Sequence, residues 1–445
     1  MQIHKFTLGD RLLVYDVGSG ALHAVDRVAW DLLDLHPDYP PQRVATLAAR
    51  YGPGEVAGAE DEIAALVAEG TLFAPDPPGE VAGEAGLPVK ALCLNVAHSC
   101  NLRCRYCFAG QGSFGGEREL MPAEVGRAAV DFLLKGAGGG RNLEVDFFGG
   151  EPLLNFPSVR ETIEYAERRA AQEGKVIHFT LTTNATLVDD RVIAYLREKQ
   201  VSLILSLDGR PEVHDRMRGD GTYTAAVDGI RRMLAGYPEA DHYLRGTFTR
   251  HNRDFAADAR HFLAQGFRRF SLEPVVGLNE DYTLREQDLA ELSAQYEELA
   301  EIYLAHQRDK DPFVFFHFQL DLTGGPCLNK RLRGCGAGTE YLAVTPKGDL
   351  YPCHQFVGRE DTRLGNLAEG GVTRPELAAK FHDNHVLAKA ACRECWARYL
   401  CGGGCHANAH LSSGRLDVPD ALGCALGKKR LETALGVQAR LAELA

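Results

Sequence analysis

The feature that most restricts the fold of this chain is the alternation of apolar strands with longer amphipathic helices, which begins at Lys90. Strands are predicted near 91–96, 143–148, 176–182, 202–207, 243–249 and 270–275, and a helix is predicted over about 285–306. Such alternation is typical of parallel β/α units. Six units predict an α/β fold with a partial (β/α)6 barrel over residues 90–310, with the chemistry at the carboxyl ends of the strands.

The first 74 residues carry a different pattern and are predicted to form a separate module. Short strands are expected over 3–8, 11–16 and 21–25, with glycine-containing turns between them. Helical periods follow over 30–35, 41–51 and 60–69, and a last strand is expected over 71–74. Residues 75–89, rich in Pro, Gly, Ala and Glu and without periodicity, are predicted to be a linker.

Length, charge and hydropathy exclude several classes of protein. A chain of 445 residues is too long for one hydrophobic core, so two or three domains are expected. The formal net charge of -12 argues against nucleic acid or an anionic membrane as the main partner. No apolar run approaches the roughly 20 residues that cross a bilayer, and the N-terminus lacks a signal peptide's apolar stretch. We therefore expect a cytoplasmic protein whose twelve cysteines are reduced and serve metal or redox chemistry.

Three cysteines follow the first barrel strand on one short loop. Cys100, Cys104 and Cys107 have the spacing C-x3-C-x2-C. Three thiolates at this spacing can bind three irons of a [4Fe-4S] cluster and leave the fourth iron open to a small molecule. A structural zinc site is the alternative, but zinc usually takes four protein ligands and no fourth Cys or His completes a common spacing here.

The ends of the next strands carry glycines and polar side chains. Phe147-Phe148-Gly149-Gly150-Glu151-Pro152 ends the second strand, and its glycines allow a close approach of backbone to a ligand. Further polar groups at strand ends are Asn184, Ser206 and Arg218, and Arg245 lies within the fifth strand. Taken singly, each of these could equally be a helix cap or a surface ion pair.

A second group of cysteines occupies the last quarter of the chain. Cys335 and Cys353 are followed by C-x2-C-x5-C-x3-C, and a last cysteine comes near the C-terminus; these later residues are Cys392, Cys395, Cys401, Cys405 and Cys424. A pair of zinc ribbons is the alternative, since ribbons share the C-x2-C element. Cys93 lies within the first barrel strand and is expected to be a buried apolar thiol.

The three-cysteine loop, with Tyr106 before its last cysteine, resembles the signature of the radical S-adenosylmethionine (SAM) superfamily. The resemblance implies that the open iron takes the amino and carboxylate groups of SAM. It assigns the SAM amino group to Gly149, Gly150 and Glu151, and ribose or carboxylate contacts to Asn184 and Ser206. Arg218 is then expected to pair with the SAM carboxylate, and Arg245 is a further candidate for that pairing.

The C-terminal array resembles the seven-cysteine SPASM domain of radical SAM peptide maturases, here over residues 311–445. The resemblance implies two auxiliary [4Fe-4S] clusters, hence three clusters in all. Cluster I would use Cys335, Cys353 and Cys405, and cluster II would use Cys392, Cys395, Cys401 and Cys424. Cys327 is either the fourth ligand of cluster I or no ligand, which leaves an open iron for a substrate thiolate.

The whole chain resembles the maturases of SCIFF (six-cysteine) peptides, from His4-Lys5-Phe6 to Tyr351-Pro352-Cys353-His354-Gln355-Phe356. This implies a radical SAM oxidoreductase that joins peptide cysteines to carbon atoms of acceptor residues by thioether bonds. Residues 1–74 would be a PqqD-like winged-helix recognition element that binds the leader of a Cys-rich precursor peptide. A ferredoxin or flavodoxin would supply electrons. A winged helix that reads DNA is disfavoured by the acidic charge.

Two other functions stay open. An anaerobic sulfatase maturase shares both cysteine patterns, but that family carries an acidic base just after the third array cysteine, where His354 follows Cys353 here. A non-catalytic iron–sulfur electron carrier or peptide-binding scaffold would need no SAM pocket. The candidates for a catalytic base are His354, Glu273 and Asp321.

Overall fold

The computed structural model describes residues 2–77, 88–322 and 328–444. Most of the predicted linker, and Cys327, lie outside these residues. Among the helices that are described, none is both long and apolar enough to cross a membrane.

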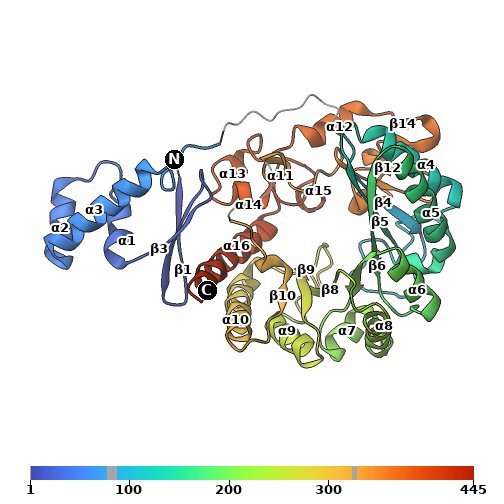
Figure 1. Ribbon diagram of the computed structural model, residues 1–445, viewed down its shortest axis with the longest axis horizontal. Coiled ribbons are helices and arrows are strands. Elements are labelled where there is room, and N and C mark those ends of the chain that lie inside the picture. Colours follow the sequence, from blue (N-terminus) through green and yellow to red (C-terminus); the bar gives the residue numbers. More distant parts are fainter. Residues whose placement is uncertain (1, 78–87, 323–327, 445) are drawn as a thin grey trace.

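Six parallel strands form the centre of the fold in the order of the sequence. They are β4 (Ala91–Ala97), β5 (Asn142–Gly149), β6 (Val176–Thr183), β7 (Ser202–Ser206), β8 (His242–Phe248) and β9 (Arg269–Pro274). The helices between and after them are α4 (Ala123–Gly136), α5 (Phe156–Gln172), α6 (Asp190–Glu198), α7 (Pro211–Arg218), α8 (Thr222–Gly236), α9 (Phe255–Ala264) and α10 (Leu289–Arg308). Figure 1 shows the strands as a curved sheet with these helices along its outer face. The predicted β/α units are confirmed.

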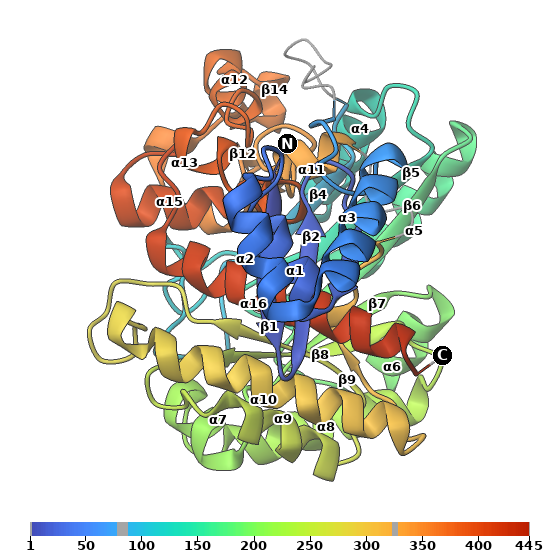
Figure 2. The same cartoon turned by 90° about the vertical axis from the view of Figure 1, so that its left-hand side faces the viewer.

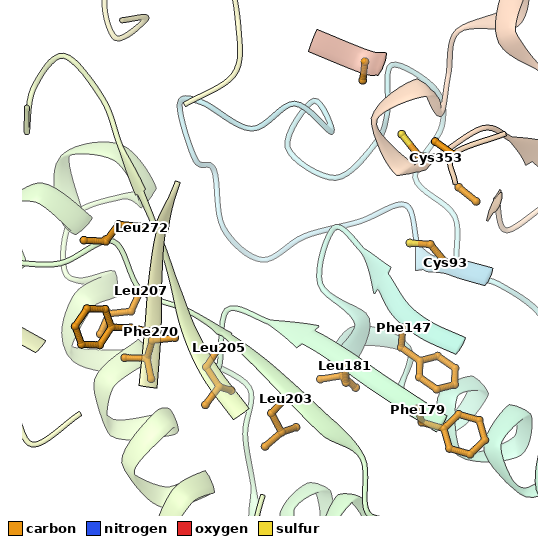
Figure 3. Packing of buried hydrophobic residues seen from close by; sticks show 14 of the residues in the cluster. Cys93, Phe147, Phe179, Leu181, Leu203, Leu205, Leu207, Phe270, Leu272 and Cys353 are labelled. Carbon is orange, nitrogen blue, oxygen red and sulfur yellow. The ribbon is translucent and has the colours of Figure 1, made fainter. Parts of the chain in front are cut away.

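Alternate side chains of these strands build the core against the helices. Leu203 and Leu205 of β7, and Leu181 of β6, are at most 1% exposed and point toward the helices (Figure 3). The residues that alternate with them along the strands, such as Ser206 and Thr182, face the other side of the sheet because side chains alternate along a strand. That other face is therefore left for the chemistry.

The C-terminal region continues the same sheet on both sides. β10 (Val314–Phe315) pairs in parallel with β9, and β11 (Tyr341–Val344) pairs in parallel with β4. The antiparallel strands β12 (Asp349–Tyr351), β13 (Gly365–Asn366) and β14 (Gly371–Val372) then follow β11. The expectation of a six-stranded barrel with a separate SPASM domain was therefore incomplete. Pairing with β11 removes the unpaired backbone edge of β4, an edge that would otherwise be open to other chains.

Short helices and the loops between them follow in the C-terminal region, and one long helix closes it. The helices are α11 (Leu328–Arg333), α12 (Pro375–His382), α13 (Ala390–Arg393), α14 (Arg398–Cys401), α15 (His406–Ser413) and α16 (Ala421–Ala442). α16 packs against α10 of the barrel and against β1 of the N-terminal module. Figure 2 shows the module in front of this long helix. One continuous core contains Leu435 of α16 together with Leu8 and Tyr15 of the module.

The N-terminal module contains the predicted three strands and three helices. β1 (Ile3–Leu8), β2 (Arg11–Asp16) and β3 (Leu22–Val25) form an antiparallel sheet, and α1 (Arg27–Leu33), α2 (Pro41–Tyr51) and α3 (Pro53–Ala68) follow. The strand expected over 71–74 is not formed. The backbone N–H groups of Thr71 and Leu72 instead donate to the Leu66 carbonyl at the end of α3. Leu72 packs into the small core of the module.

Specific contacts attach this module to the C-terminal region. The His4 ring stacks on Trp396 with 3.9 Å between ring centroids, and His4 Nε2 lies 2.8 Å from Glu432 Oε1. Arg398, which is buried, donates to the Gln2 side chain and pairs with Asp76. The module is therefore docked on the residues around α14 and α16 rather than held by the linker alone.

Candidate functional site

A cavity opens at the carboxyl ends of β4 to β7. Its wall includes all three cysteines of the first loop and seven of the eight residues predicted to contact SAM, which are Tyr106, Gly149, Gly150, Glu151, Asn184, Ser206 and Arg218. The eighth, Arg245, is not part of the wall. Residues from four strand ends, up to 118 positions apart in the sequence (Cys100 to Arg218), thus meet in one place.

The three-cysteine loop is fixed by backbone and amide contacts. The Arg105 N–H donates to the Met217 carbonyl at 2.7 Å, and Asn184 Nδ2 lies 3.9 Å from Cys100 Sγ. All three thiols are half-buried. Burial raises the pKa of Cys104 to about 12 and raises that of Cys100 as well. Thiolates are therefore unfavourable here unless a cation such as iron binds them, and this donor set fits a metal cluster.

The two glycines at the end of β5 are required by close packing. Gly149 has φ of +132°, and a β-carbon on it would overlap the Ala97 carbonyl oxygen. A β-carbon on Gly150 would overlap the carbonyl oxygen of Ser99, the residue before Cys100. The sequence predicted a close approach of this backbone to a ligand. The glycines also allow a close approach of β5 to the backbone that leads into the cysteine loop.

Glu151 joins the ends of β5 and β6 inside the cavity wall. It is 1% exposed and accepts hydrogen bonds from the Thr183 hydroxyl at 2.7 Å and the Asn184 N–H at 2.9 Å. The Leu153 N–H is a third donor. Burial raises the pKa of Glu151 to about 7, although these hydrogen bonds oppose the shift. Glu151 therefore positions Asn184 beside Cys100 as well as lining the cavity.

A buried ion pair lies beneath the cysteine loop, and sequence reasoning missed its acidic member. Asp208 is fully buried and accepts from Arg218 Nε and Nη2, both at 2.9 Å. It also accepts from the Tyr106 hydroxyl at 2.6 Å and the Thr247 N–H at 3.0 Å. Burial acts to raise the pKa of Asp208, but Arg218 outweighs it and holds the pKa below its usual value. The only sequence signal was the acid in Ser206-Leu207-Asp208-Gly209.

The ion pair with Asp208 affects which of the two arginines predicted to pair with the SAM carboxylate is free to do so. Arg218 commits two of its N–H groups to Asp208. Arg245 pairs across the sheet with Ser206, a cavity residue, so the two side chains share a face. Arg245 is exposed, and it makes no hydrogen bond or ion pair with any residue that the structure describes.

The three candidate bases lie in different surroundings. The His354 ring packs against Phe148 and Phe108, which both line the cavity, with centroids 4.9 and 5.4 Å apart. Its Nδ1 lies 3.2 Å from the Tyr341 hydroxyl. Burial lowers the pKa of His354 to about 4, and the charge of Arg245 adds to the shift. His354 is thus a neutral imidazole at the cavity edge.

Glu273 and Asp321 are less suited to take a proton in the cavity. Burial acts to raise the pKa of Glu273, but His317, Arg430 and Arg245 outweigh it and hold that pKa at about 2. His317 Nε2 lies 2.6 Å from the Glu273 carboxylate. Asp321 is exposed, lies after η3 (Phe316–Phe318) and is not part of the cavity wall.

The later cysteines gather in two groups. Cys353 is buried, and its pKa is raised by burial and by the nearby thiols of Cys405 and Cys335. The other group surrounds Cys424, whose pKa is raised to about 11 by burial and by three nearby thiols, those of Cys401, Cys392 and Cys395. These are the two sets that the family resemblance implies, with Cys327 outside the described residues. No disulfide joins any described cysteines, and among the described side chains no three His, Cys, Asp or Glu converge on a single metal ion.

Cys93 belongs to none of these groups. It is 1% exposed on β4, and its pKa is raised well above the usual value by burial. Its sulfur lies in the packed region between β4 and the segment that carries Cys353 (Figure 3). The prediction of a buried thiol is confirmed.

Two protein-family models match the chain. The model described as "Radical SAM superfamily" matches residues 94–243, and that described as SPASM, "Iron-sulfur cluster-binding domain", matches residues 335–396. The first match contains the cavity wall. The second contains Cys335, Cys353, Cys392 and Cys395, and ends before the last three cysteines.

Curated relatives cover about three quarters of the chain. A serine-type anaerobic sulfatase-maturating enzyme from Klebsiella aerogenes is 26% identical over 349 residues, which are 74% of this chain and 81% of that protein. The mycofactocin maturase MftC of Mycobacterium ulcerans is 29% identical over 342 residues, which are 74% of this chain and 86% of that protein.

Two solved structures share the fold. The structure titled "Native anSMEcpe with bound AdoMet" has a TM-score of 0.66 at 20% identity, and the match covers 80% of this chain and 100% of that one. Streptococcus suis SuiB bound to S-adenosylmethionine has a TM-score of 0.53 at 16% identity, with 95% of this chain and 98% of that one covered. The second match includes nearly the whole chain.

Proposed function

We propose that this chain, which carries a radical SAM domain followed by a SPASM iron–sulfur domain, is a peptide maturase that forms thioether cross-links. The substrate is a ribosomally made, cysteine-rich precursor of the six-cysteine (SCIFF) type. Peptide thiols are joined to carbon atoms of acceptor residues. The relatives named above as a sulfatase-maturating enzyme and a mycofactocin maturase support a maturase in general.

One observation carries this proposal: the cavity and the Cys353 site adjoin each other. His354, next to Cys353, packs on Phe108 and Phe148 of the cavity wall. A peptide in the barrel therefore has the place for hydrogen abstraction on one side and a metal site for a thiol on the other. Iron lowers the pKa of a bound thiol and holds its sulfur, which favours carbon–sulfur bond formation.

The residues present fit the cofactors that this function needs. The SAM-binding [4Fe-4S] cluster would be held by Cys100, Cys104 and Cys107. The two later cysteine groups would hold the auxiliary clusters, and Cys327 is either the fourth ligand of auxiliary cluster I or no ligand. When bound, the cluster and SAM supply the reductive cleavage that yields methionine and a hydrogen-abstracting 5'-deoxyadenosyl radical. The chain itself binds, orients and excludes water. Asp208 positions Tyr106 of the loop, and Glu151 positions Asn184.

Within this site, Arg245 is assigned to the SAM carboxylate in preference to Arg218. Arg218 is engaged by Asp208, whereas Arg245 makes no hydrogen bond or ion pair with a described residue, acts on Glu273 only at longer range, and shares a face with Ser206. Arg245→Met is expected to weaken SAM binding about 10- to 100-fold, since a hydrogen bond to a charged group contributes about 1.5–3 kcal/mol. Arg245→Lys should keep part of the affinity. Calorimetric titration of SAM into anaerobically reconstituted protein measures both, and unchanged affinity in Arg245→Met would refute the assignment.

The N-terminal module is proposed to bind the leader of the precursor. Its sheet has the order β1-β2-β3, so β1 and β3 are edge strands. An extended peptide can add to such an edge through backbone hydrogen bonds. The contacts of His4 and Arg398 attach the module to the C-terminal region, so a leader bound to the module would lie near the auxiliary clusters. A ferredoxin or flavodoxin is the proposed electron donor.

The deciding experiment uses the protein reconstituted anaerobically with SAM, a reductant and a six-cysteine precursor peptide. Mass spectrometry should show the loss of two hydrogens for each thioether bond. The second candidate, sulfatase maturation, is favoured by the sulfatase-maturating relatives. Formylglycine formed from a cysteine predicts loss of sulfur, and formylglycine formed from a serine predicts loss of two hydrogens with every peptide thiol still free to alkylate; either product would overturn the thioether proposal. A scaffold without catalysis predicts no deoxyadenosine.

A further inference from the structure

A fully buried lysine lies among the C-terminal cysteines. Lys389 is 1% exposed and immediately precedes α13. Its ammonium donates to the carbonyl of Gly403 at 2.8 Å, in the Gly402-Gly403-Gly404 loop between Cys401 and Cys405. Figures 1 and 2 place α13 and α15 together above α16. The ammonium thus links two cysteine-bearing segments.

This lysine has no negative partner in the described chain. An ammonium has three N–H donors, and Gly403 accepts only one of them among the described residues. No described carboxylate lies within ion-pair distance of it; Asp417, whose pKa is lowered by Arg415 and at longer range by Lys389, pairs with Arg415 instead. Lysine is almost never fully buried unless it is paired.

The groups that act most strongly on Lys389 are thiols. Burial lowers the pKa of Lys389, and Cys392, Cys401, Cys424 and Cys405 oppose that shift. Three of these thiols belong to the group around Cys424, and Cys405 belongs to the group around Cys353. A negative partner for Lys389 would therefore lie where the two cysteine groups would bind their clusters.

We propose that Lys389 is a counter-cation shared by the two auxiliary clusters, and that it raises their reduction potentials. The inference rests on the auxiliary-cluster part of the proposed function and adds a positioning role for one residue. A thiolate-bound [4Fe-4S] cluster is an anion, and reduction adds a further negative charge. A fixed cation nearby stabilises the reduced form more than the oxidised form. The two N–H groups that no described residue accepts are also available as donors to sulfur.

The test removes the charge and keeps the hydrogen bond. Lys389→Gln retains an amide donor for Gly403, and Lys389→Arg retains the charge. Lys380→Gln is the matched control, because Lys380 is exposed on α12 of the same region. All are made in full-length protein that also carries Cys100→Ala, Cys104→Ala and Cys107→Ala, so that the auxiliary clusters are observed alone. Redox titration followed by electron paramagnetic resonance measures their midpoint potentials.

At the midpoint potential of the parent protein, Lys389→Gln is expected to lower the ratio of reduced to oxidised cluster about tenfold. For a one-electron couple this is a shift of about 59 mV to more negative potential. The shift should be larger for the Cys424 group. Lys389→Arg should stay near the parent and Lys380→Gln should not shift. An unshifted potential in Lys389→Gln overturns the inference.

Other outcomes also decide. Loss of the auxiliary clusters in Lys389→Gln but not in Lys389→Arg supports charge compensation, because the charge is then needed for assembly. Loss in both variants overturns it, since the lysine would then act through packing. A parent protein without iron and sulfide in its C-terminal region refutes the proposed function itself, which separates that failure from failure of this inference.

Discussion

Cys104→Ala is expected to abolish 5'-deoxyadenosine formation and peptide cross-linking, with both products below detection. Cys104 is the central thiol of the loop, and two remaining thiolates cannot hold three irons of a cluster. Among the described residues, no hydrogen bond or ion pair joins this loop to the C-terminal cysteine groups. The iron bound by those groups should therefore remain. Anaerobic reconstitution, iron and sulfide analysis and chromatography of deoxyadenosine measure the effect.

The matched control is Cys93→Ala. Cys93 is a buried thiol on β4, the strand that leads into the loop, and it belongs to none of the three cysteine groups. This variant should retain deoxyadenosine formation, with at most a modest loss of stability. Normal deoxyadenosine formation by Cys104→Ala would show that the cavity is not a SAM site.

Arg218→Met is expected to lower the free energy of unfolding by about 3–5 kcal/mol, because it leaves the Asp208 carboxylate buried without its partner. The pair is well shielded, since Asp208 is fully buried and Arg218 is 8% exposed. Asp208, which accepts from the Tyr106 hydroxyl, would no longer be held by Arg218, so the loop should bind less iron. Urea unfolding followed by circular dichroism gives the stability, and the iron content gives the second effect.

Two further variants test the cause. Arg216→Met on the same helix α7 should change stability by no more than about 0.5 kcal/mol, because Arg216 is exposed. Asp208→Asn combined with Arg218→Met should recover part of the loss, since no unpaired buried charge remains. A double variant as unstable as the sum of the single variants would show that the two side chains act independently.

The strands and helices of the barrel could be predicted because their signal is local. Apolar runs such as 202–207 and the amphipathic pattern between them arise from residues that are neighbours in the sequence. The pairing of β11 with β4 could not be predicted in this way. These strands are about 250 residues apart, and their pairing depends on which edge is free once the barrel has formed. The strand expected over 71–74 failed for a different, local reason, since the N–H groups of Thr71 and Leu72 are used to end α3.

By itself, the sequence determined which residue types carry the chemistry. Cysteine spacing is read directly from the order of residues in the chain, so the loop at Cys100 and the later array could be identified before any fold was known. Only the tertiary structure decided how charges are shared among the remaining groups. It paired Arg218 with Asp208, left Arg245 without a hydrogen bond or ion pair to any described residue, and buried Lys389 near the thiols of Cys392, Cys401, Cys405 and Cys424. The physical reason is that the cost of a buried charge depends on neighbours brought from distant parts of the chain, and spacing along the sequence does not contain them.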